Sequence, residues 1–124
     1  MTAATHSNHS ALEGVWYPLY AEHEGEEAPK MVLDKMEIEL VAGKYFVRFA
    51  GAVMDTGTYT VDADNDLTLL GVTGHNAGRT NPCIFKFAGG ALSICYGLGG
   101  ERPKKHATGP GQQLYLANYH RKET

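Results

Sequence analysis

The chain has 124 residues, of which 43% are hydrophobic and 20% are charged, so it can form one domain with a buried core. The formal net charge of −3 argues against nucleic acid as the main partner, because phosphate binding requires a basic face. Residues 1–10 are polar and lack an apolar stretch. We therefore expect a disordered tail over 1–10, no signal peptide, no membrane span and a cytoplasmic monomer or homodimer.

From residue 12 onward, the predicted elements alternate between strand and turn. A two-turn helix is expected over 29–35, because Pro29 suits the first helical position and apolar side chains follow at helical spacing. Many short strands joined mostly by hairpins favour an all-β, eight-stranded antiparallel up-and-down barrel over 11–122, in which closure removes exposed edges. The expected strands are 12–22, 36–40, 45–49, 53–61, 67–71, 81–87, 91–97 and 114–121.

The dipeptide Gly89-Gly90 predicts a two-residue hairpin and fixes a register for the strands beside it. In that register Cys83 lies opposite Tyr96 on the inward face, whereas Cys95 points outward from the neighbouring strand. We therefore expect two free thiols and no disulfide, as is usual for a cytoplasmic protein.

Several stretches along the chain resemble an uncharacterised family of small bacterial lipocalin-like domains. Leu12-Glu13-Gly14-Val15-Trp16 resembles the G-x-W opening strand of lipocalins. The other matching stretches are Gly57-Thr58-Tyr59, Gly89-Gly90-Ala91-Leu92-Ser93-Ile94-Cys95, Glu101-Arg102-Pro103, Gly109-Pro110-Gly111-Gln112 and Arg121-Lys122. The resemblance implies a lipocalin (calycin) barrel in which Trp16 closes one end under Arg121. By analogy of fold it also implies a carrier of hydrophobic ligands. Members of the family are often exported, whereas we expect no signal peptide in this chain.

Two strands leave open which side chains face the barrel interior. In the last strand, either Leu114 and Leu116 or the alternate positions 115, 117 and 119 face inward, and a cover of Trp16 by Arg121 favours the second set. In the strand 53–61, either Asp55 faces inward or its neighbours at 54, 56 and 58 do, which would leave Asp55 on the surface.

Alternation from Trp16 predicts an inward face that is apolar with several phenols, which is typical of a small-molecule pocket. We therefore expect the barrel to bind a small hydrophobic or aromatic molecule without a cofactor. The alternative is a solid barrel, filled by its tyrosines, that serves as a structural or interaction module. The residues expected to bind the ligand are Tyr20, Tyr45, Val47, Phe49, Asp55, Tyr59, Cys83, Phe85, Tyr96 and Tyr115.

A second functional hypothesis is a cofactor-free enzyme that uses the same cavity for cyclase- or isomerase-type acid–base chemistry. The candidate proton-transfer groups are Asp55, Tyr59 and His106. An inward carboxylate loses its hydration, which favours proton uptake and therefore suits a general base. The sequence leaves open whether the protein is an enzyme.

The loops add three smaller expectations. His75 and His106 lie in Gly-rich loops, but no ligand spacing supports a metal site. The segment 98–112 is long enough to act as a lid over a cavity. Its basic cluster at 102–106 is interpreted as a solvated loop.

Overall fold

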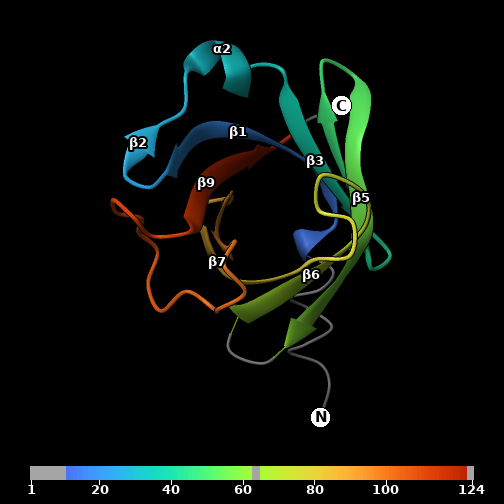
Figure 1. Cartoon of the computed structure of the whole chain (residues 1–124). Helices are drawn as coiled ribbons and strands as arrows, with labels where there is room; N and C mark the ends of the chain where they lie inside the picture. Colours follow the sequence, from blue (N-terminus) through green and yellow to red (C-terminus); the bar gives the residue numbers. More distant parts are fainter. Residues whose placement is uncertain (1–10, 63–64, 123–124) are drawn as a thin grey trace.

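A closed ring of eight antiparallel strands forms the body of the protein (Figure 1). The computed structural model describes residues 11–62 and 65–122; the tail predicted over 1–10 lies outside the described residues. Neighbouring strands in the ring follow one another along the chain, and β1 pairs with β9 to close it. The strands are β1 (Gly14–His23), β3 (Met36–Val41), β4 (Lys44–Phe49), β5 (Ala52–Asp62), β6 (Asp66–Gly74), β7 (Thr80–Ala88), β8 (Ala91–Gly97) and β9 (Leu114–Arg121).

This architecture confirms the predicted eight-stranded up-and-down barrel with a short helix after the first strand. The helix α2 (Lys30–Leu33) is shorter than the predicted 29–35, because Pro29 is an extended N-cap and the helix ends at its C-cap, Asp34. An additional two-residue strand, β2 (Glu26–Glu27), pairs with the end of β1. Among residues 11–62 and 65–122, no helix has the length and apolar character needed to cross a membrane.

Alternation along β3 and β4 decides which side chains face the barrel interior. Ile38 and Leu40 are buried in the core. The alternate residues Glu37 and Glu39 point outward, where both carboxylates accept hydrogen bonds from Arg48 of β4 at 3.0 and 2.9 Å. This period-two pattern is the signal from which these strands were predicted.

Trp16 closes one end of the barrel. Its side chain is 1% exposed, and its indole Nε1–H donates to the carbonyl of Leu12 at 2.8 Å. The guanidinium of Arg121 lies 4.2 Å above the indole ring and also donates to the carbonyls of Ala11 and Glu13. A cation over an indole face is stabilised by the negative charge of the ring face. In β9, Ala117 and Tyr119 belong to the core and Tyr115 packs against it, so the second of the two alternatives is the observed one.

The β7–β8 hairpin has the predicted register, with Cys83 opposite Tyr96 across the strands. Cys83 faces the core, whereas Cys95 faces outward, and both are free thiols. Cys95 is nevertheless fully buried, because the backbone around Ala107 lies against it. The segment that contains Ala107 therefore covers part of the outer wall.

We call this segment, residues 98–113, the strap. Figure 1 shows it in orange, outside the ring of strands. Arg102 fastens it to β6 and β7 through the carbonyls of Leu67 and Cys83, at 3.1 and 2.7 Å. Thr108 fastens it to β1, because its hydroxyl donates to a carboxylate oxygen of Glu22 at 2.7 Å. These anchors hold the middle of the strap on the outer wall, whereas Leu98, at its start, lines the pocket described below, so a lid over the cavity stays a prediction.

A bulge in β1 reverses the strand's alternation. The pairing with β9 shifts between Pro18 and Tyr20, so Leu19 is an extra residue on the β1 side. Beyond the bulge Tyr20 lies opposite Asn118 on the outer face, and its hydroxyl donates to Glu22. The prediction that Tyr20 faces the interior is therefore wrong.

Candidate functional site

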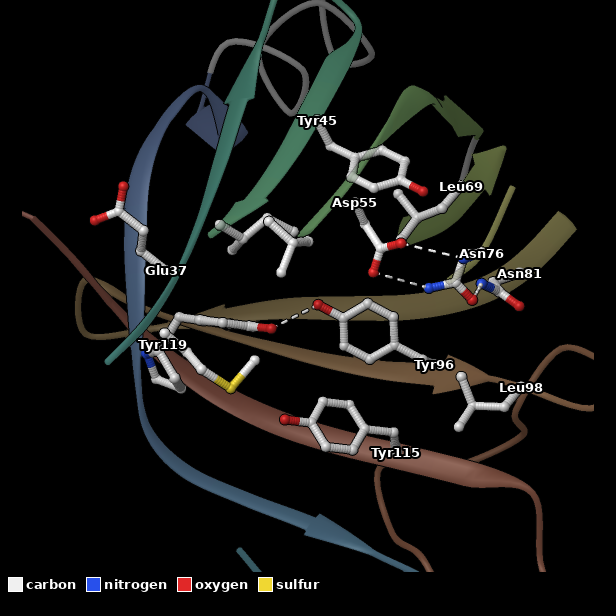
Figure 2. Close-up of a pocket in the computed structure, with 14 residues that line it drawn as sticks. Glu37, Tyr45, Asp55, Leu69, Asn76, Asn81, Tyr96, Leu98, Tyr115 and Tyr119 are labelled. Atoms are coloured by element: carbon white, nitrogen blue, oxygen red, sulfur yellow. Dashed lines mark hydrogen bonds between the residues drawn. The ribbon is translucent and has the colours of Figure 1, made fainter. Parts of the chain in front are cut away.

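A pocket of ≈ 180 Å³ lies inside the barrel, away from the end that Trp16 closes (Figure 2). Cavities of about 150 Å³ accept a molecule the size of benzene, whereas pockets for drug-sized ligands begin at about 300 Å³. The space therefore suits a molecule with a single ring. The lining residues are Pro18, Met36, Glu37, Ile38, Tyr45, Val47, Asp55, Leu69, Asn76, Asn81, Tyr96, Leu98, Tyr115 and Tyr119.

Tyrosine side chains from three strands form much of the pocket wall. Tyr45 comes from β4, Tyr96 from β8, and Tyr115 and Tyr119 from β9. The hydroxyls of Tyr96 and Tyr119 share one hydrogen bond at 2.6 Å, so one O–H of this pair is left to donate elsewhere. Burial raises the pKa of both phenols far above 10. They are therefore neutral hydrogen-bonding groups at physiological pH.

Asp55 of β5 supplies a carboxylate on the strand next to that of Tyr45 and across the ring from β9, and Figure 2 shows it below Tyr45. The residue is 8% exposed, whereas Met54 is 42% exposed, so the inward alternative for β5 is the observed one. A register shift between β4 and β5 places Asp55 opposite Val47 and leaves Met54 without a cross-strand partner on β4. The inward side chain is thus set by a bulge as well as by alternation.

Two asparagines hold the Asp55 carboxylate in place. The backbone N–H of Asn76 donates to Oδ1 at 3.1 Å, and its side-chain amide donates to Oδ2 at 3.4 Å. The amide of Asn81 donates in turn to the side-chain oxygen of Asn76 at 3.3 Å. The three side chains form one directed chain of hydrogen bonds along the pocket wall (Figure 2).

The Gly-rich connection between β6 and β7 brings Asn76 to this wall. The amide N–H of Gly78 donates to the carbonyl of Gly71 at 2.9 Å, which folds the connection into a closed loop. Gly74 has φ +90°, and a Cβ there would overlap the carboxylate of Asp55. Glycine is therefore required where the loop approaches Asp55. The sequence indicated this loop by its composition, but it gave no signal that Asn76 and Asn81 reach the pocket.

The structure brings together half of the residues predicted to bind a ligand. Those that line the pocket are Tyr45, Val47, Asp55, Tyr96 and Tyr115. Tyr59, Cys83 and Phe85 are buried in the core but do not line it. Phe85 packs against Phe87, which also contacts Trp16 at the closed end. Phe49 is 36% exposed at the end of β4, before the turn to β5, and it does not line the pocket.

The other two proposed proton-transfer groups are also separate from Asp55. His106 belongs to the strap, and its Nδ1 lies 3.4 Å from the hydroxyl of Ser93 on the outer wall. Burial and the nearby Lys86 lower the pKa of this histidine. Tyr59 is enclosed in the core. Neither residue reaches the pocket, so of the three candidates only Asp55 faces it.

The buried thiol of Cys83 is unreactive. Burial raises the pKa of its thiol to about 12, and its Sγ donates to the carbonyl of Asn81 at 3.3 Å. The thiolate, which is the nucleophilic form, is therefore strongly disfavoured at neutral pH. Within residues 11–62 and 65–122, no group of three or more His, Cys, Asp or Glu side chains is arranged to hold a metal ion.

Comparison with models of known protein families finds no match to the chain, and comparison with curated proteins finds none either.

Proposed function

We propose that the barrel binds a small, mostly apolar molecule of about one ring in its pocket. The observation that carries this proposal is the composition of the pocket wall. Phenol rings and aliphatic side chains form most of it, and Asp55 and Asn76 place polar groups at one side. Apolar walls with a few convergent polar groups are typical of small-molecule sites. A volume of ≈ 180 Å³ is also more than a solid barrel would leave empty.

We also infer that the chain is lipocalin-like. The closed eight-stranded ring supports this inference, as does the packing of Arg121 over Trp16 at one end. A barrel of eight strands has room inside for one small ligand. This agrees with the single-ring ligand suggested by the pocket.

Ligand-dependent thermal stabilisation tests the binding proposal. A ligand that binds only the folded state at 100 times its Kd stabilises that state by about 2.7 kcal/mol. A panel of single-ring compounds such as toluene, phenol, benzylamine and benzoate should contain at least one that raises the Tm. A flat response across the panel would refute the proposal.

Two matched variants locate the binding site. Val47 lines the pocket, so Val47→Phe fills part of the space and should abolish the ligand-induced rise in Tm. Val72 is 61% exposed on β6, outside the pocket, so Val72→Phe makes the same chemical change where it should not affect binding. Equal responses of the two variants to the ligand would place the site elsewhere.

The cofactor-free enzyme is a second candidate, favoured by one observation. The Asp55 carboxylate faces the same pocket as several neutral phenols, which is an arrangement of one base with hydrogen-bond donors. A single-ring carbon acid such as acetophenone should then exchange its methyl protons with D2O faster in the presence of the protein. Asp55→Asn should remove the acceleration, and equal exchange rates with and without the protein would exclude this role.

A further inference from the structure

We propose that the ligand is an organic cation, an ammonium group attached to a single ring, with its charged nitrogen against Asp55. This inference rests on the proposed binding function and specifies the chemical class of the ligand. It follows from the charges of the pocket, from the free acceptor positions of Asp55 and from the phenol rings around them.

Among the residues that the structure describes, Asp55 is the one charged residue of the pocket wall that has no counter-charge. Glu37 is the other acidic residue of the lining, but its carboxylate pairs with Arg48 at 3.0 Å and with Lys122 at 3.6 Å. Figure 2 shows the Glu37 carboxylate pointing away from the pocket. No Lys, Arg or His lines the pocket, and among the described residues no cationic side chain forms an ion pair with Asp55.

The hydrogen bonds of Asp55 leave room for a further donor. A carboxylate has about four acceptor positions, two on each oxygen. Asn76 occupies one position on each oxygen, through its backbone N–H and its side-chain amide. Figure 2 shows the Asp55 carboxylate directed toward the space between Tyr45 and Tyr96. An ammonium N–H placed in that space can therefore bond to Asp55 without displacing Asn76.

A cation compensates Asp55 in a way that a neutral ligand does not. An ionised group that is nearly buried and unpaired costs free energy, because it loses hydration without gaining an opposite charge. A charge-assisted hydrogen bond is about twice as strong as a neutral one. An anionic ligand would add repulsion to the cost of burial. The pocket therefore discriminates by the sign of the ligand's charge.

The tyrosines favour the same ligand. The faces of phenol rings carry negative charge and attract cations that lie within about 6 Å of the ring centre. Tyr45, Tyr96, Tyr115 and Tyr119 all line the pocket, and burial keeps their hydroxyls protonated by raising each pKa. The rings thus supply attraction to an ammonium group without adding formal charge. They also pack against the apolar part of the ligand.

A series of three ligands of the same size but different charge tests the inference. Calorimetric titration at pH 7 compares benzylamine, which is protonated at this pH, with neutral benzyl alcohol and with anionic benzoate. We expect benzylamine to bind about tenfold or more tightly than benzyl alcohol, and benzoate to bind most weakly. This series uses the wild-type protein, so it decides the question whether or not a variant folds.

Two variants then assign the preference to one carboxylate. Asp55→Asn should remove the advantage of benzylamine over benzyl alcohol. Glu39→Gln makes the same chemical change at a carboxylate that is paired with Arg48 at 2.9 Å and does not line the pocket, and it should leave that advantage unchanged. Circular dichroism establishes that each variant is folded.

The outcomes separate this inference from the proposed function. Benzyl alcohol or benzoate binding as tightly as benzylamine would overturn the cation while the binding function stands. An advantage that survives in Asp55→Asn would overturn the role of that carboxylate. If none of the single-ring compounds binds, the binding function itself is refuted, and this inference fails with it.

Discussion

Replacing Arg102 should release the strap from the barrel wall. Its guanidinium donates to the carbonyls of Leu67 and Cys83 and to the hydroxyl of Thr68, at 3.1, 2.7 and 3.0 Å. It also lies 3.6 Å from the carboxylate of Asp66. Methionine has a similar length and keeps the apolar stem, but it can make none of these hydrogen bonds.

The structure gives a magnitude for this loss. A hydrogen bond from a charged donor contributes about 1.5–3 kcal/mol when it is well shielded, and less where water competes. The Arg102 side chain is 31% exposed, so we take about 1 kcal/mol for each of the three bonds. Arg102→Met should then lower the free energy of unfolding by about 3 kcal/mol. At roughly 4 °C per kcal/mol for a chain of this length, the Tm should fall by roughly 12 °C.

Urea unfolding followed by Trp16 fluorescence measures the effect, because that indole is buried in the barrel. Lys105→Met removes an exposed charge from the same segment and should change stability by less than about 0.5 kcal/mol. Arg102→Lys should fall between the two, since an ammonium cannot match the forked guanidinium. If Arg102→Met is as stable as Lys105→Met, the hydrogen bonds of Arg102 do not anchor the strap.

Three further substitutions test other contacts of the barrel. Gly57→Ala would push a Cβ into the carbonyl of the neighbouring strand and into a phenol ring of the pocket, and should cost about 2–3 kcal/mol in urea unfolding. Tyr119→Phe removes its hydrogen bond with Tyr96 and should cost about 1 kcal/mol in the same assay. Hydrogen bonds from Tyr20 and Thr108 lower the pKa of Glu22 below its ordinary 4.5. The ionised carboxylate therefore stabilises the folded state at pH values above 4.5. This stabilisation is lost as the pH falls through the pKa of Glu22 in the folded protein. Glu22→Gln should therefore be less stable than wild type at pH 7, and Tm measurements should show the difference shrinking below pH 4.5. An unchanged free energy of unfolding in Gly57→Ala or Tyr119→Phe would contradict the first two predictions. A Tm difference between Glu22→Gln and wild type that does not change with pH would contradict the third.

The barrel itself could be predicted from the sequence because its signals are local. Alternation marks the strands, as at Ile38 and Leu40, and the Gly89-Gly90 turn fixes the register of the hairpin beside it. A turn placed correctly fixes the orientation of every side chain in the hairpin, because each residue's face follows from that of its neighbours. The orientation of Cys83 was therefore predicted correctly from a turn several residues away.

The pocket could be predicted only in part, because bulges and long connections decide the rest. A bulge has no clear signal in one sequence, and the one at Leu19 moves Tyr20 to the outer face. The contact between Asn76 and Asp55 spans two strands and depends on how a loop folds back. Arg102 was interpreted as part of a solvated cluster, since its acceptors are backbone carbonyls whose positions only the fold reveals.

The closure of the ring by β1 and β9 has a consequence for how the protein reaches its native state. Trp16 pairs with Arg121 more than a hundred positions later, whereas most other pairs of neighbouring strands are joined by short turns. Contacts between distant parts of a chain form slowly, because loop closure costs entropy before the contact is made. Until that seam forms, both strands present edges of unpaired N–H and C=O groups to other molecules. We therefore expect refolding to be limited by this final pairing and its yield to fall at high protein concentration.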